Sequence, residues 1–89
     1  MKAIISVTGK DSMGIIAKVA SACAETGVNI VDISQTVLKE YFAMIMLVDI
    51  DKITVPFGSF VDRMTELGRS SGLEIHTMHE DIFNAMHRI

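Results

Sequence analysis

The segment at residues 7–34 constrains the fold of this chain more than any other part. A strand leads into it, and a polar loop, GKDS, occupies residues 9–12. Apolar side chains then recur with the 3.6-residue period of a helix, at Ile15, Ile16, Val19, Ala20 and Cys23. Gly27 ends this helix where a left-handed residue is wanted, and Asn29 opens the next strand. The pattern predicts a strand, a helix and a second strand in succession.

The same order recurs in the second half of the chain. Period-two patterns predict strands at residues 2–8, 29–38, 41–50 and 73–78. A second helix begins with Pro56 at its first position and ends at Gly72. The tail, residues 79–89, has the spacing of a short amphipathic helix. The third strand is apolar on both faces, which predicts a central strand that is covered on both sides.

The order β-α-β-β-α-β predicts an α+β fold of the ferredoxin-like type. We expect a four-stranded antiparallel sheet with both helices on one face and the first and third strands in the middle. The whole chain, residues 1–89, forms one domain, with the helical tail at about 80–88. The other sheet face carries Ile4, Ser6, Asp32, Ser34, Thr36 and His76. This mixed face predicts a cover formed by the tail, a second subunit or both.

Charge and composition exclude several classes of partner. The net charge is −3, from eleven acidic and eight basic residues without a basic cluster, so we expect no nucleic-acid partner. No apolar run approaches the ~20 residues that span a bilayer, and the amino terminus does not resemble a signal peptide. The single cysteine, Cys23, lies on an apolar helix face, which fits a cytoplasmic protein. Hydrophobic residues make up 49% of the chain, which favours a homo-oligomer.

The start of the first helix is the first place to look for a ligand site. A loop that feeds a helix leaves backbone N–H groups free, and these suit a carboxylate or another anion. Asp11 or Ser12 is the expected N-cap, and Gly14 falls in the first turn. A glycine there costs about 1 kcal/mol relative to alanine. It is explained either by close packing on a strand or by a ligand that approaches the backbone.

Two short motifs resemble those of the ACT domain. Residues 10–17, KDSMGIIA, resemble its D-x-x-G-[IL]-[IL]-[AH] opening, and residues 27–30, GVNI, resemble its G-x-N-I continuation. ACT domains are small regulatory modules that typically bind amino acids. The longer pattern V-x-G-K-D-x-x-G-I-I-A, with D-I-S-Q-T and the tail I-F-x-A-M, resembles a family of small stand-alone ACT proteins of unknown function. That family is related to regulators of the glycine cleavage system.

The resemblance implies a ligand site between two subunits of a homodimer or a higher homo-oligomer. The loop after the first strand would form one wall, with Lys10, Asp11, Ser12, Met13 and Gly14. Asn29 and Ile30 of a neighbouring subunit would form the other wall. Free N–H groups would bind the carboxylate of a small amino acid, and Asp11 or Asn29 would accept from its ammonium group. The implied function is regulatory and non-catalytic, without a cofactor. The alternative is a dimerisation module that docks on another protein and binds no ligand.

Other chemistries have little support in the sequence. No serine or cysteine nucleophile has an evident histidine base, and the first loop lacks the arginine of acylphosphatases, which share this fold. The exposed aromatic residues of RNA-binding domains are also missing. A metal site is one interpretation of His76, His79, Glu80 and His87. We interpret these residues as a solvated strand end and helix terminus. Similarly, Asp32, Ser34 and Thr36 are interpreted as solvated or interface positions.

Overall fold

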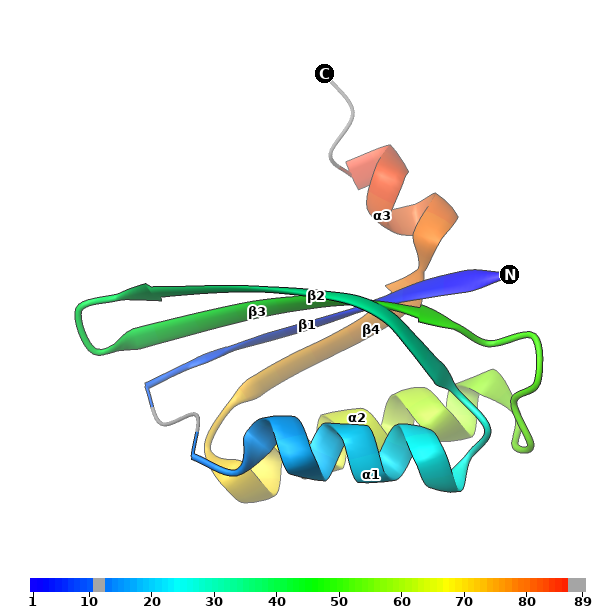
Figure 1. Ribbon diagram of the computed structural model, residues 1–89, viewed down its shortest axis with the longest axis horizontal. Helices are drawn as coiled ribbons and strands as arrows, with labels where there is room; N and C mark the ends of the chain where they lie inside the picture. The colour runs from blue at the N-terminus through cyan, green and yellow to red at the C-terminus, as the bar shows by residue number, and fades with distance from the viewer. Residues whose placement is uncertain (11–12, 87–89) are drawn as a thin grey trace.

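The computed structural model describes residues 1–10 and 13–86. Its elements are β1 (Lys2–Gly9), α1 (Ile15–Glu25), β2 (Asn29–Leu38), β3 (Tyr41–Asp49), α2 (Phe57–Ser71), β4 (Glu74–His79) and α3 (Glu80–Met86). Helices α1 and α2 lie on one face of the sheet, and α3 rises from the opposite face (Figure 1). The predicted ferredoxin-like fold with an added helix is confirmed. None of the described helices is long and apolar enough to cross a membrane.

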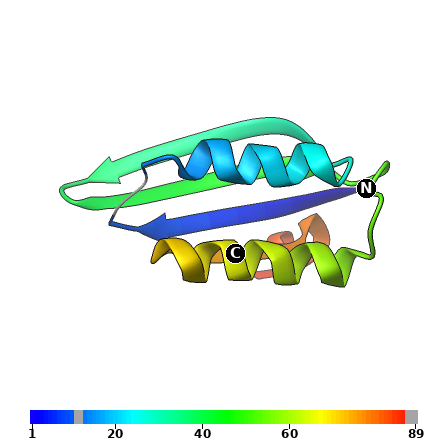
Figure 2. The same ribbon diagram turned by 90° about the horizontal axis from the view of Figure 1, so that it is seen from below.

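The sheet has the strand order β2-β3-β1-β4, and every neighbouring pair is antiparallel. Strands β1 and β3 therefore occupy the centre, as predicted. Figure 2 shows α1 and α2 running alongside each other beneath the sheet. Two strand–helix–strand units with right-handed crossovers produce this arrangement.

The hydrophobic core lies between the sheet and the helices α1 and α2. Alternate residues of β1 and β3 point into it, in accordance with the period of two. The largest fully buried side chains include Ile5, Met44 and Met46 from the sheet and Phe60 and Met64 from α2. The periodicity in the sequence therefore identified the core-facing residues of both layers.

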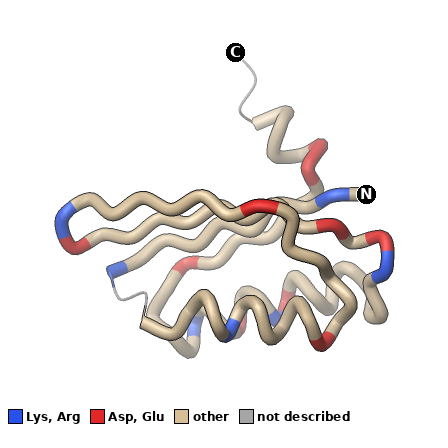
Figure 3. The backbone as a smooth tube through the Cα atoms, viewed as in Figure 1, with Lys and Arg blue, Asp and Glu red and all other residues tan. Residues whose placement is uncertain are grey.

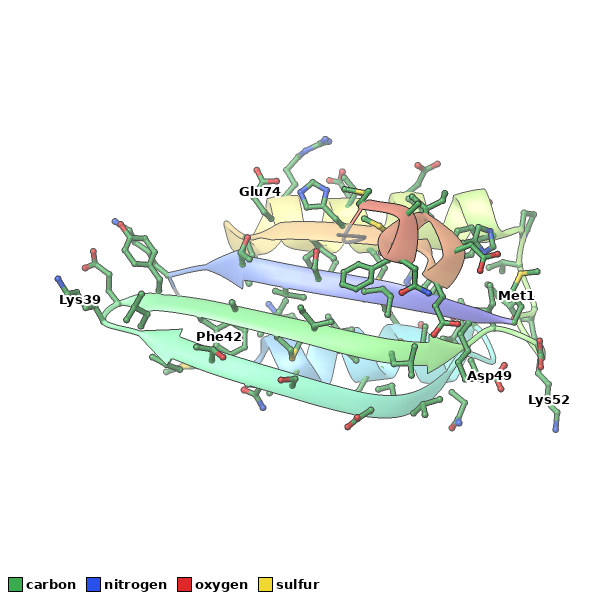
Figure 4. All side chains as sticks on the ribbon, turned by 90° about the horizontal axis from the view of Figure 1, so that it is seen from above. Met1, Lys39, Phe42, Asp49, Lys52 and Glu74 are labelled. Atoms are coloured by element: carbon green, nitrogen blue, oxygen red, sulfur yellow. The ribbon has the colours of Figure 1, made fainter. Side chains whose placement is uncertain are left out.

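The second face of the sheet is only partly covered. Helix α3 contacts β1 and β4, and Figure 4 shows that it leaves most of β2 and β3 open. Ile45, on β3, keeps 45% of its surface exposed. Among the described residues, α3 covers only part of this face, so the cover of β3 by a second subunit stays a prediction.

Two local predictions were also wrong. A register shift between Ile30 and Asp32 places Ile30 opposite Val48, on the core face, and Asp32 opposite Leu47, on the open face. Strict alternation had put Ile30 and Asp32 on one face, but a β-bulge adds a residue and reverses the order. Pro56 is the N-cap of α2 with a ψ of 143°, so it precedes the first helical residue.

Candidate ligand-binding site

Helix α1 begins later than the sequence suggests. Its N-cap is Gly14, with φ 74° and ψ −3°, in the left-handed region. The predicted caps, Asp11 and Ser12, lie outside the described residues. A Cβ on Gly14 would meet no atom of the described residues within 4 Å, so close packing against them does not explain this glycine. The positive φ explains it instead, because residues with a Cβ are strained there.

The amino-terminal end of α1 is exposed and carries no acidic residue in its first turn. Gly14 has no side chain to cap the helix; its carbonyl accepts the N–H of Lys18 at 3.1 Å. Met13 is 89% exposed. The Lys10 ammonium lies 3.9 Å from a Glu40 carboxylate oxygen and 5.6 Å from the centre of the Tyr41 ring. The positive end of the helix dipole favours an anion at this exposed helix start, while the described contacts of Lys10 are with the β2–β3 turn.

The second predicted wall lies at the start of β2. Asn29 is exposed and lines a hollow of about 390 Å³, whose other lining residues are Gly27, Asp49, Asp51 and Lys52. Figure 4 places Asp49 and Lys52 at the same end of the sheet as Met1. The side chain of Ile30 is half-buried and packs against the core, so only its backbone can face this hollow.

Charged groups of both signs surround this hollow. The Asp49 carboxylate accepts the backbone N–H of Asp51 at 2.9 Å. The Asp51 carboxylate accepts from the ammonium group of Met1, and this contact holds the pKa of Asp51 below its ordinary value. Figure 3 shows that charged residues gather at two ends of the sheet, namely the turn between β2 and β3 and the loop after β3. The hollow belongs to the second of these groups and combines the carboxylates of Asp49 and Asp51 with the ammonium groups of Lys52 and Met1.

The two predicted walls are not brought together within one chain. Residues 10 and 13–14 precede α1, whereas Asn29 and Ile30 follow it (Figure 1). Helix α1 has 11 residues and is therefore about 16 Å long. The walls can meet only if the loop of one copy approaches the β2 start of another, as the resemblance implied.

Three charged residues of this hollow were not predicted from the sequence, namely Asp49, Asp51 and Lys52. Asn29 pairs with Asp49 in the β2–β3 ladder. A two-residue turn at residues 39–40 fixes this ladder, so counting back from the turn would have placed the third strand's acidic end near Asn29. The overlooked signal was therefore the hairpin register and not a motif.

The two described histidines lie on opposite faces of the sheet. His76 lies on the open face, with its Nε2 atom 3.2 Å from a Glu74 carboxylate oxygen. The His79 ring lies 4.2 Å from the Phe57 ring, centre to centre, on the helix side. His87 lies outside the described residues. Within residues 1–10 and 13–86, no group of three or more His, Cys, Asp or Glu residues could hold a metal ion.

Comparison with known proteins identifies the family. The family model of the ACT domain matches residues 2–76. The chain belongs to the ACT-domain family. A UPF0237 protein of Clostridium acetobutylicum is 49% identical over 89 residues and covers 100% of both chains, so this ACT domain is one of the small UPF0237 proteins.

Solved structures agree with this assignment. An ACT domain protein from Streptococcus pneumoniae is 44% identical, with a TM-score of 0.80 and 98% coverage of both chains. A putative glycine cleavage system transcriptional repressor is 22% identical, with a TM-score of 0.67 over 85% of this chain and 43% of that one. At that identity the second likeness concerns the fold alone.

Proposed function

We propose that this ACT domain is a non-catalytic regulatory module that binds a small amino acid between two copies of the chain. The observation that carries the proposal is the start of α1, where the N-cap residue, Gly14, has no side chain and neighbours a Met13 that is 89% exposed. Membership of the ACT family supports a regulatory role. The chain acts in the cytoplasm in this proposal, because its single cysteine is a buried free thiol.

The two walls would recognise opposite ends of the ligand. The N–H groups of the first turn of α1 bind the carboxylate of the amino acid, helped by the charge of Lys10. The side-chain oxygen of Asn29 in the second copy accepts from the ammonium group, and the Asp49 carboxylate attracts it. Asp11, Ser12 and Met13 complete the first wall, and the backbone of Ile30 completes the second.

Thermal unfolding in the presence of each of the twenty amino acids tests this proposal. A ligand at a hundred times its dissociation constant adds about 2.7 kcal/mol to the free energy of unfolding. For a domain of this size, that raises the Tm by about 10 °C or more. We expect one amino acid, or a group of similar ones, to give such a rise. The absence of a rise with all twenty, in a folded oligomer, would contradict ligand binding.

A matched pair of variants at Gly14 tests the position of the site. Asp and Asn both tolerate the left-handed region better than other side chains, so both variants keep the fold. Gly14→Asp places a negative charge where the ligand's carboxylate must bind, and it should abolish the rise in Tm. Gly14→Asn has the same shape without the charge and should retain most of the rise. Equal responses of the two variants would place the ligand elsewhere.

A dimerisation module that docks on another protein is the second candidate function. It is favoured by the exposed apolar side chains of β2, the edge strand, such as Val37, which is 69% exposed. This candidate predicts no change in Tm with any amino acid. It also predicts that a protein partner co-purifies with the wild-type chain and is lost with Val37→Lys.

A further inference from the structure

A separate cavity lies between α3 and the open face of the sheet. Its volume is about 410 Å³, and its lining residues come from three strands and the helix: Ser6, Ile45, His76, Met78, Phe83 and Met86. None of these residues belongs to the walls of the proposed amino-acid site. The cavity is therefore a second place where this chain can hold a small molecule.

The connection between β4 and α3 explains why the cavity exists. His79 ends β4 and Glu80 begins α3, so no linker residue separates them. The helix therefore leaves the sheet at the strand end and rises away from it (Figure 1). Phe83, one turn from the sheet, is half-buried, whereas Met86 remains 65% exposed. Helix α3 therefore lies apart from the open sheet face beyond its first turn, and this separation leaves the space between them open.

The described part of the lining disfavours charged ligands. Four of the six described lining residues are apolar, and none is Lys, Arg, Asp or Glu. The Glu74 carboxylate is outside the lining but lies 3.2 Å from the Nε2 atom of His76, so it would repel an anion that approaches His76. A cationic group would lose hydration against Ile45, Met78 and Phe83. The described lining therefore favours an uncharged ligand.

The same residues favour an aromatic ring with one polar group. Thioether sulfurs, here Met78 and Met86, contact ring edges favourably, and Phe83 offers an edge-to-face partner. The Ser6 hydroxyl and the His76 ring provide hydrogen bonds on one side only. The volume falls in the lower part of the range that small-molecule pockets occupy, about 300–1,000 Å³.

We propose that this cavity binds an uncharged aromatic molecule with one hydrogen-bonding group, of the indole or phenol class. The ring lies between Phe83, Met86 and the sheet, and its polar group bonds to Ser6 or His76. This binding does not depend on the amino-acid site, since the two sites share no residue.

Methionine methyl NMR tests the proposal with indole and phenol as probes. In protein labelled at the methionine methyl carbons, we expect saturable shifts of the Met78 and Met86 signals. The Met44, Met46 and Met64 signals should stay unchanged, because these side chains are fully buried on the other side of the sheet. They also report whether each variant is folded.

Ser6→Leu and Thr8→Leu form a matched pair. Both residues lie on β1 and face the same side, but only Ser6 lines the cavity. Ser6→Leu fills the cavity and should weaken indole binding by about tenfold or more, whereas Thr8→Leu should leave it unchanged. Met86→Glu lies at an exposed helix position and leaves the sheet unchanged. It should weaken indole binding in the same way.

Three results would overturn the proposal. The first is an absence of saturable shifts at Met78 and Met86. The second is an equal loss of binding in Ser6→Leu and Thr8→Leu. The third is an indole response that disappears as protein concentration rises, since a second copy of the chain would then occupy the cavity.

Discussion

Gly14 and Gly58 both have room for a Cβ, yet only Gly14 needs to be glycine. Neither position has an atom within 4 Å of an added Cβ. Gly14 has a φ of 74°, whereas Gly58 lies in the first turn of α2 without a positive φ. The sequence could not separate the two, because it shows neither the dihedral angle nor the exact start of a helix. The sequence therefore led to the wrong expectation that glycine at position 14 is less stable than alanine.

Alanine substitutions at these two glycines should act in opposite directions. Gly14→Ala should lower the free energy of unfolding by about 1 kcal/mol, because alanine is strained at positive φ. Gly58→Ala should raise it by about 0.5–1 kcal/mol, because alanine favours the helix and loses less entropy on folding. Urea unfolding measures both values. A change of the same sign in both variants would contradict the role of φ.

Folding changes the titration of the Cys23 thiol. It is 1% exposed, and burial raises its pKa from an ordinary value of 9.0 to about 11, with a smaller opposing effect of Arg63. The raised pKa means that the folded state binds the proton more tightly than the unfolded state. This contribution to stability is complete below pH 9.0 and is lost as the pH rises through about 11.

We therefore expect an alkaline loss of stability that depends on Cys23. Between pH 8 and 11, the free energy of unfolding of the wild type should fall more than that of Cys23→Ala, by on the order of 2 kcal/mol. Urea unfolding across this pH series measures the difference. Native protein at pH 8 should also react slowly with a thiol reagent. Parallel pH profiles of the two proteins would show that the thiol does not cause the loss.

At the scale of elements, periodicity predicted the strands and helices well. Strand β2 has the predicted bounds, and the alternation in β3 identified its buried face. Periodicity could not show the bulge beside Ile30. The residues around the bulge are apolar at both alternating positions, so the inserted residue does not interrupt the pattern. Periodicity also could not show how far α3 reaches across the sheet, since that depends on the direction in which the chain leaves β4.

The turn of the β2–β3 hairpin contains a strained residue. Lys39 has a φ of 57°, which is unfavourable for a side chain with a Cβ, whereas Glu40 has no positive φ. Lys39→Gly should therefore raise the free energy of unfolding by about 0.5–1 kcal/mol, since glycine removes the strain. Glu40→Gly should lower it, because glycine gains nothing there and loses more entropy. If urea unfolding shows the reverse order, the turn has a different backbone conformation.

At the scale of the whole molecule, the single chain leaves an edge strand and part of a sheet face exposed. Strand β2 is an edge strand, and the described residues leave much of the open sheet face without a cover. The two predicted walls of the amino-acid site lie at opposite ends of α1. The sequence predicted both walls only through the resemblance to ACT domains, because no motif states which copy of the chain supplies each wall. We expect a homodimer at micromolar concentration, which light scattering measures directly.

Mixing two inactive variants tests whether each site is shared between copies. A symmetric dimer holds two equal sites, each with the α1 start of one copy and Asn29 of the other. Gly14→Asp and Asn29→Ala should each abolish binding alone. In a dimer that contains one chain of each variant, one site carries both changes and the other carries none. Refolding an equal mixture should therefore restore about a quarter of the wild-type sites, since about half of the dimers are mixed. Titration with the amino acid found by thermal unfolding measures the fraction, and native mass spectrometry confirms that mixed dimers form. If mixed dimers are present and no binding returns, both walls belong to the same copy and the shared site is wrong.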